Sequence, residues 1–188
     1  IALEAERIDD PREAVETLPS HRLRAPVARL ADDLGVAWER LRGELPELPT
    51  RIIHGDLKLS NLRFDGREAV ALIDLDTLAH GTLDVELGDA LRSWCGAAGE
   101  DVAEAAFDLD VFEAAMAGYA SGRGAWGPTP AEWAAVVPGA QRIATELSMR
   151  FAADALRESY FGWDRDRFPA AGEHNLLRAT GKIGRAHV

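Results

Sequence analysis

Apolar side chains recur every three or four residues along most of the chain, which predicts a mostly helical protein. The first such stretch covers residues 11–44, where Ser20 is placed to cap a helix. Two prolines in the segment 44–50 end this stretch, because the residue before a proline disfavours helical backbone.

The helical pattern resumes after residue 80 and predicts two helices. Asp84 is placed to cap a helix that continues to Trp94. A second helix is expected from about Asp108 to Tyr119, where a glycine-rich segment follows.

The last third of the chain has a clear helix start. Thr129 and Glu132 stand at the two ends of a capping box, with a proline at the first helical position. Pro138 is expected to divide this stretch into a short helix and a long helix that ends near Tyr160. One more helix is expected to begin near Glu173.

Residues 51–76 interrupt the helical pattern with short apolar runs typical of strands. Strand candidates are residues 51–54, 62–64 and 69–73. The pair Asp65-Gly66 between the last two is among the strongest hairpin signals, because both turn positions favour positive φ.

A two-residue turn at Asp65-Gly66 fixes a register for this hairpin. Phe64 then pairs with Arg67, and the extended register places Asp74 across from Leu57, beside Asp56. We therefore expect the segment that begins at Asp56 to meet Asp74 at the open end of the hairpin.

Composition and charge narrow the possible functions. The chain carries a net charge of −11, which argues against nucleic-acid binding, and no apolar run approaches the ~20 residues of a membrane span. Cys95 is the single cysteine, so no disulfide can form within the chain. We expect a cytoplasmic protein; the oligomeric state stays open.

The candidate chemistry lies in two short segments, residues 54–61 and 73–76. Phosphoryl transfer needs a carboxylate that orients a hydroxyl group and oxygen ligands that hold Mg²⁺ on nucleotide phosphates. Asp56 can provide the carboxylate, and Asn61 and Asp74 the metal ligands. Lys58 can neutralise charge on the transferred group.

The sequence His54-Gly55-Asp56, followed by Asn61, closely resembles the Brenner-type catalytic loop of aminoglycoside phosphotransferases and their relatives. It is also similar to the His-Arg-Asp loop of protein kinases. The strings DLKLSN, IDLDT and ELGDALRS look most like the N-acetylhexosamine kinase branch.

The resemblance implies an α+β, mostly helical fold: the C-terminal lobe of the protein-kinase-like fold, with a small antiparallel hairpin carrying the catalytic loop. Asp56 matches the catalytic base, and Asn61 and Asp74 match the magnesium ligands. Lys58 matches the loop lysine that contacts the co-substrate ATP. Positions that match a second shell or a substrate contact are His54, Asp76, Asp89 and Arg92. For Asp89 and Arg92 a surface ion pair is an equal alternative.

The resemblance covers most of residues 20–180, and residues 1–182 are expected to form this lobe. The family's N-terminal nucleotide lobe is not recognisable, so the chain alone is expected to be inactive. Residues 183–188 are expected to be a non-native tail.

The expected reaction is ATP-dependent phosphorylation of a small-molecule hydroxyl, with a sugar such as an N-acetylhexosamine as acceptor. Aminoglycoside or choline kinases are alternatives within the family. Residues 70–78 also resemble the nucleophile strand of haloacid-dehalogenase-type phosphatases, with Asp74 as nucleophile. A third alternative is a kinase-like binding module without catalysis.

Overall fold

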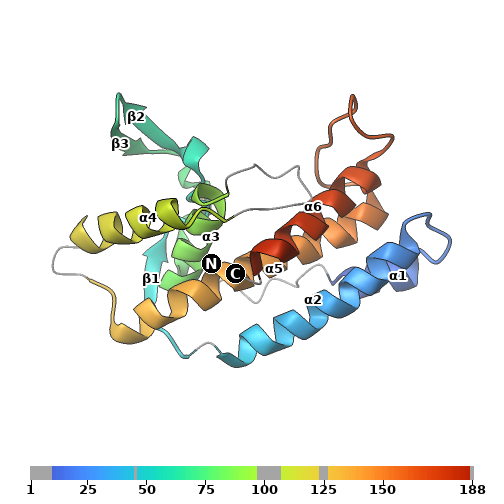
Figure 1. Cartoon of the computed structure of the whole chain (residues 1–188), viewed down its shortest axis with the longest axis horizontal. Helices are drawn as coiled ribbons and strands as arrows, with labels where there is room; N and C mark the ends of the chain where they lie inside the picture. The colour runs from blue at the N-terminus through green and yellow to red at the C-terminus, as the bar shows by residue number, and fades with distance from the viewer. Residues whose placement is uncertain (1–9, 45, 97–106, 123–126, 187–188) are drawn as a thin grey trace. The chain divides into compact units, whose positions relative to one another are not determined.

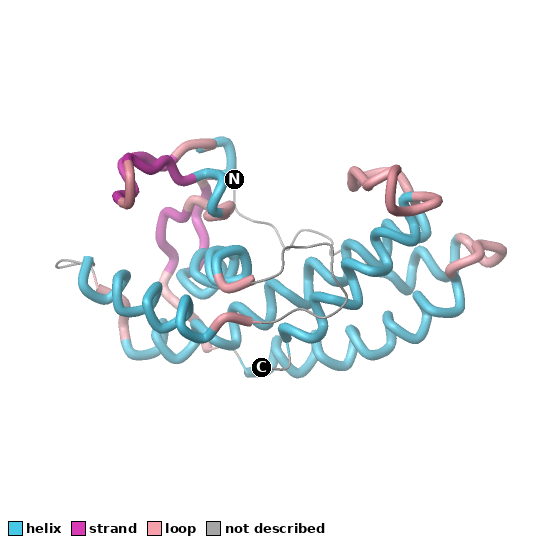
Figure 2. The backbone as a smooth tube through the Cα atoms, turned by 45° about the horizontal axis from the view of Figure 1, so that its top comes forward, coloured by secondary structure: helices cyan, strands magenta, loops and turns pink. Residues whose placement is uncertain are grey.

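The computed structural model describes residues 10–44, 46–96, 107–122 and 127–186, which divide into two compact units. The first unit comprises the described residues of Glu44–Ala97 and Phe107–Ile143. The second comprises those of Ala5–Gly43 and Ala144–Val188. Helices form most of the described chain and the strands are short (Figure 2), so the expected α+β, mostly helical fold class is confirmed. None of the helices in the described ranges combines the length and hydropathy of a membrane span.

The first unit contains all the strands of the described chain, arranged in two antiparallel pairs (Figure 1). β1 pairs with β4, and β2 pairs with β3. Helix α3 lies against β1 and β4, and its apolar side chains form a core with those of α4 and of the first part of α5. The elements are β1 (Thr50–Ile53), β2 (Leu62–Asp65), β3 (Glu68–Leu72), β4 (Ala79–Thr82), α3 (Leu83–Trp94), α4 (Leu109–Gly122) and α5 (Pro130–Arg157), with short 3₁₀ turns at Leu59–Asn61 and Leu75–Thr77.

The β2–β3 hairpin is where the sequence predicts it, but its predicted register was wrong. Asp65 pairs with Glu68, and Phe64 with Ala69, so the turn residues are Gly66 and Arg67. Gly66 has a φ of 60°, whereas Asp65 stays in the strand. This turn needs positive φ only at its first central position, which Gly66 occupies. The predicted turn would have needed positive φ at Asp65 as well.

An irregularity between Arg63 and Phe64 shifts the register once more, and the N–H of Ile73 donates to the carbonyl of Asn61 over 2.9 Å. Ile73, the residue before Asp74, therefore pairs with Asn61. The predicted register, which placed Asp74 across from Leu57, was wrong.

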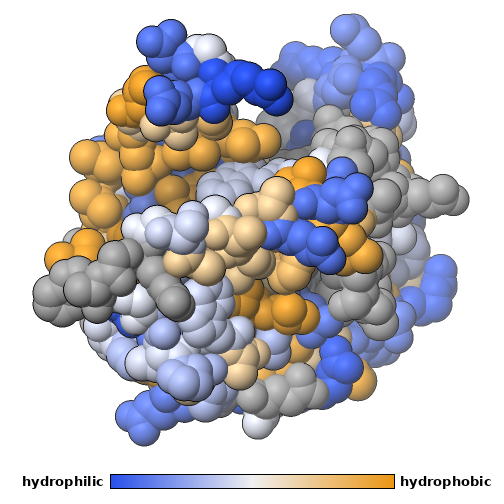
Figure 3. Space-filling view, turned by 60° about the vertical axis from the view of Figure 1, so that its left-hand side comes forward, coloured by the Kyte–Doolittle hydropathy of each residue, from blue (hydrophilic) through white to orange (hydrophobic). Residues whose placement is uncertain are grey.

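The hairpin carries large apolar side chains on its surface. Phe64 and Val70 are both more than half exposed, and Figure 3 shows apolar surface gathered on this side of the unit. A two-stranded sheet without a buried face gains little from apolar burial. Its place in the unit therefore depends on the loops at its open end.

Two of the predicted helix features of the first unit were wrong. Asp84 does not cap α3: it lies in the first turn, buried, with its carboxylate 2.9 Å from Arg142. Pro138 does not split the helix, because α5 runs through it without a break. The next residue, Gly139, packs so closely on α3 that a Cβ there would lie 2.5 Å from the carbonyl oxygen of Asp84. This packing holds the helix where proline removes one backbone hydrogen bond.

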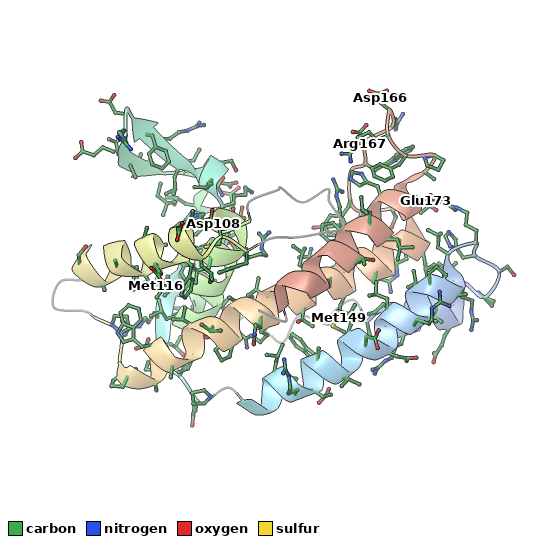
Figure 4. All side chains as sticks on the ribbon, in the orientation of Figure 1. Asp108, Met116, Met149, Asp166, Arg167 and Glu173 are labelled. Carbon is green, nitrogen blue, oxygen red and sulfur yellow. The ribbon has the colours of Figure 1, made fainter. Side chains whose placement is uncertain are left out.

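Other predicted helix starts are confirmed. Asp108 accepts a hydrogen bond from the N–H of Val111 at the start of α4, where Figure 4 shows it. Thr129 and Glu132 form the capping box: each backbone N–H donates to the other side chain, over 2.8 and 3.2 Å.

The second unit is a helical bundle of α1 (Pro11–Thr17), α2 (Arg24–Glu44), the rest of α5, and α6 (Ala171–Ala186). Its core includes Val27, Leu34 and Met149, the last labelled in Figure 4. The helical stretch predicted over residues 11–44 forms two helices joined by residues 18–23, and Ser20, the predicted cap, lies within that connection and not next to the start of α2 at Arg24. Asp10 instead caps α1 by accepting from the N–H of Arg12.

Candidate active site

Three of the predicted site residues contact one another in the loop of residues 54–61, which joins β1 to β2. The carboxylate oxygen Oδ2 of Asp56 accepts hydrogen bonds from Lys58 Nζ over 2.5 Å and from Asn61 Nδ2 over 3.0 Å. Asn61 Nδ2 also donates to the backbone carbonyl of Asp56 over 2.9 Å. The spacing of two and five residues after Asp56 therefore brings a cation and an amide onto one carboxylate.

The acidic residues of the site raise the pKa of Lys58. Its hydrogen bond to Asp56 raises the pKa of the ammonium group, and the negative charges of Asp56, Asp74 and Asp89 raise it further against the opposing effect of partial burial. Lys58 is therefore positively charged at neutral pH. The same interactions place Asp74 and Asp89 in the electrostatic neighbourhood of the loop.

His54 ties the loop to the segment that precedes Asp74. It is buried, its Nδ1 accepts from the N–H of Asp56 over 3.2 Å, and its Nε2 lies 3.0 Å from the carbonyl of Ile73. These two contacts require a neutral imidazole with the proton on Nε2. His54 thus positions Asp56 through the backbone.

Sequence reasoning missed the residue that shapes the start of this loop, Glu86 of α3. Its two carboxylate oxygens accept from the N–H groups of His54 and Gly55, both over 2.9 Å. Gly55 has a φ of 77°, and a Cβ there would lie 3.1 Å from the carbonyl oxygen of Thr77. Glycine is therefore required both by the backbone conformation and by the space.

α3 holds the middle of the loop as well. Trp94 Nε1 donates to the carbonyl of Leu57 over 2.7 Å, and Ser93 Oγ accepts from the N–H of Leu59 over 3.3 Å. Ser93 and Trp94 come about two helical turns after Glu86, so all three lie on one face of the helix. Polar side chains on an otherwise apolar helix face are the signal that could have revealed them.

Asp74 has an unusual backbone. Its φ of 65° and ψ of 62° are left-handed, a conformation that is costly for a residue with a side chain. Such strain occurs preferentially at functional sites. The side chain is exposed at the start of the 3₁₀ turn Leu75–Thr77. Asp76, within that turn, is exposed as well.

Asp89 and Arg92 form an ion pair of 2.9 Å on α3, with side chains only 15% and 12% exposed. The pair is therefore mostly buried, unlike the surface pair considered from the sequence. Burial makes it costly to break, because the remaining charge would be unpaired.

The oxygen atoms of Asn61 and Asp74 would suit Mg²⁺ only together with phosphate oxygens and water. No group of three or more His, Cys, Asp or Glu side chains in the described ranges is arranged to hold a metal. Mg²⁺ is usually held by one or two protein oxygens together with phosphate oxygens and water. Asn61 and Asp74 fit that donor set by their chemistry: Nδ2 of Asn61 donates to Asp56, so a metal ion would meet the Oδ1 of this side chain.

The model of the phosphotransferase enzyme family matches residues 3–125, about two thirds of the chain. The matched range contains every site residue described above. The family predicted from the loop motif is therefore confirmed.

Proposed function

The chain belongs to the phosphotransferase enzyme family, and on that premise we propose that it transfers the γ-phosphoryl group of ATP to a hydroxyl group of a small molecule. The observation that carries the proposal is the contact of Asp56 with both Lys58 and Asn61. A base, a cation and an oxygen ligand in one loop are the groups that phosphoryl transfer requires.

In the proposed reaction, Asp56 orients the acceptor hydroxyl and accepts its proton. Oδ2 of Asp56 is already engaged by Lys58 and Asn61, which leaves Oδ1 for the hydroxyl. The acceptor oxygen forms a bond to the γ-phosphorus, the bond between that phosphorus and the β,γ-bridging oxygen breaks, and ADP leaves. Lys58 stabilises the charge on the transferred group.

Asn61 and Asp74 would hold Mg²⁺ on the ATP phosphates, where the cation neutralises negative charge. The remaining residues position this set. His54 and Glu86 fix the loop backbone, and the buried pair of Asp89 and Arg92 supports the surroundings of Lys58.

The proposed acceptor is a sugar of the N-acetylhexosamine type, converted to its 1-phosphate. The support is the resemblance of the segment that carries Glu86, Asp89 and Arg92 to that branch of the family. We further propose that residues 1–182 form one lobe of the enzyme.

The test is acceptor-dependent ADP release by the full-length protein that carries this sequence, with Mg-ATP and N-acetylhexosamines, plain hexoses, aminoglycosides or choline. Asp56→Asn keeps the size of the side chain but removes the base, so turnover should fall by about 1,000-fold. Asp65→Asn, at the end of β2 and exposed, is the matched control and should retain activity.

The panel also separates the alternatives. ADP release that requires one acceptor class names that class. Binding of Mg-ATP without turnover on any acceptor would favour a non-catalytic binding module. A separate assay without ATP tests the phosphatase alternative: hydrolysis of a phosphate ester there would favour a phosphatase with Asp74 as nucleophile.

A further inference from the structure

The second unit contains a cavity of about 210 Å³ where α5 ends and the following loop begins. Figure 4 shows this loop, with Asp166 and Arg167 at its far end. The residues that line the cavity are Arg150, Asp154, Arg157, Ser159, Tyr160 and Phe161. None of them belongs to the proposed catalytic loop.

The one carboxylate in the lining, Asp154, is occupied in holding the loop. It is 4% exposed and accepts from the N–H groups of Ser159, Tyr160 and Phe161 over 2.9–3.0 Å. It also accepts from Asn175 Nδ2 over 2.9 Å. Four donors to one carboxylate occupy its acceptor oxygens. They also fix the backbone that carries the other lining residues.

Arg150 lines the same cavity and is held by aromatic rings. Its guanidinium carbon lies 5.5 Å from the ring centre of Tyr160 and 5.7 Å from that of Phe161, and one Nη donates to the Tyr160 hydroxyl over 3.4 Å. Among the residues that the structure describes, no carboxylate forms an ion pair with Arg150. Cation–π contacts orient a guanidinium without using its N–H donors.

Further donors surround this guanidinium. Arg157 adds a second positive charge to the lining, with one Nη 3.7 Å from the half-exposed Glu13. The hydroxyl groups of Ser159 and Tyr160 can also donate. The lining therefore carries two positive charges and one negative charge, in a chain whose net charge is −11. Guanidinium groups match the oxygens of phosphates and carboxylates with two parallel hydrogen bonds.

We propose that this cavity binds a small oxyanion of the phosphate or carboxylate class. Its volume lies below that of a pocket for a drug-sized ligand, which restricts the ligand to a small anion or an anionic end group. Phosphate should bind more tightly than acetate, because it offers more acceptor oxygens to the two guanidiniums and two hydroxyls.

The test is calorimetric titration of the full-length protein with inorganic phosphate and, separately, with sodium acetate, at constant ionic strength and without ATP. The wild type should bind one anion per chain. Arg150→Gln should weaken that binding at least tenfold. Arg165→Gln is the matched control, since Arg165 also lies over an aromatic ring, 5.7 Å from that of Trp163, but is not among the lining residues.

A second variant covers the case in which Arg150→Gln disturbs folding. Ser159→Ala removes one donor from an exposed residue and should weaken binding about threefold. Equal binding by the wild type and both cavity variants, or an equal loss in the Arg165→Gln control, would overturn the proposal. Whether phosphate or acetate binds more tightly identifies the class of ligand. The titration contains no ATP, so its result does not depend on the outcome of the kinase assay.

Discussion

The loop of residues 54–61 in the first unit and the loop of residues 158–161 in the second are held in the same way, by a carboxylate that accepts from consecutive backbone N–H groups. In the first loop the carboxylate is Glu86, more than 30 residues further along the chain. In the second it is Asp154, at most seven residues from the three backbone N–H groups that it accepts from.

Glu86 therefore holds its loop through the tertiary structure, whereas Asp154 holds backbone that is close to it in the sequence. Asp154 terminates its own helix, and the residue that follows the helix, Glu158, has a φ of 50°. Glu86 reaches from α3 into a loop that carries Asp56, Lys58 and Asn61. We therefore expect changes at Asp154 to act mainly on stability and changes at Glu86 to act mainly on turnover.

The largest effect is expected from Asp154→Ala, which leaves three backbone N–H groups and a buried amide without their acceptor. The free energy of unfolding should fall by about 3 kcal/mol, measured by urea denaturation. Asp164→Ala is the control, because Asp164 accepts from the N–H groups of Asp166 and Arg167 in an exposed loop. A loss of less than about 1 kcal/mol at Asp154 would remove the basis of the comparison.

Glu132 is a third buried carboxylate, and its contribution to stability should depend on pH. The hydrogen bond from Arg51 lowers the pKa of this buried carboxyl from 4.5 to about 2. A lowered folded-state pKa stabilises the protein above the ordinary pKa, and this contribution is lost as the pH falls from about 4.5 to 2.

Glu132→Gln should therefore cost up to about 3 kcal/mol of unfolding free energy at pH 7 and much less near pH 2. Denaturation at several pH values measures it. Glu68→Gln, on the exposed strand β3, should show no such dependence. Parallel pH curves for the wild type and Glu132→Gln would show that this carboxylate does not contribute.

Glu86→Gln tests whether the first loop is held for turnover more than for stability. The amide keeps one acceptor oxygen but turns a donor toward the second of the N–H groups of His54 and Gly55. The kcat should fall about 10–100-fold while the free energy of unfolding changes by about 1 kcal/mol. A fall in stability as large as that for Asp154→Ala, with kcat unchanged, would reverse the assignment of the two loops.

The smallest effect concerns the metal ligands beside the first loop. Asp74→Asn should raise the Mg²⁺ concentration for half-maximal rate about tenfold, because a neutral amide binds the cation less well than a carboxylate. Asp76→Asn is the matched neighbour, exposed two residues away, and should change it by less than about twofold. Equal shifts for both variants would indicate a general charge effect.

The sequence predicts local features well. The capping box at Thr129 and the hairpin between residues 62 and 72 are both present, because adjacent residues specify them. The register of the hairpin was not predictable from Asp65-Gly66 alone, since the turn could form one residue later around the same glycine.

Features that depend on packing were not predicted. Pro138 stays within α5 because Gly139 lies against α3. β4 forms because it pairs with β1, a strand that is distant in the sequence. In the site, the spacing of Asp56 and Asn61 predicts their proximity, whereas Glu86 reaches the loop only through the position of α3.

The most direct test of the central claim, that the loop at Asp56 catalyses phosphoryl transfer, is ³¹P NMR of the full-length protein with Mg-ATP and the acceptor panel. We expect a new phosphomonoester signal from the acceptor together with ADP, both absent in Asp56→Asn. The same signals at the wild-type rate in Asp56→Asn would contradict the claim.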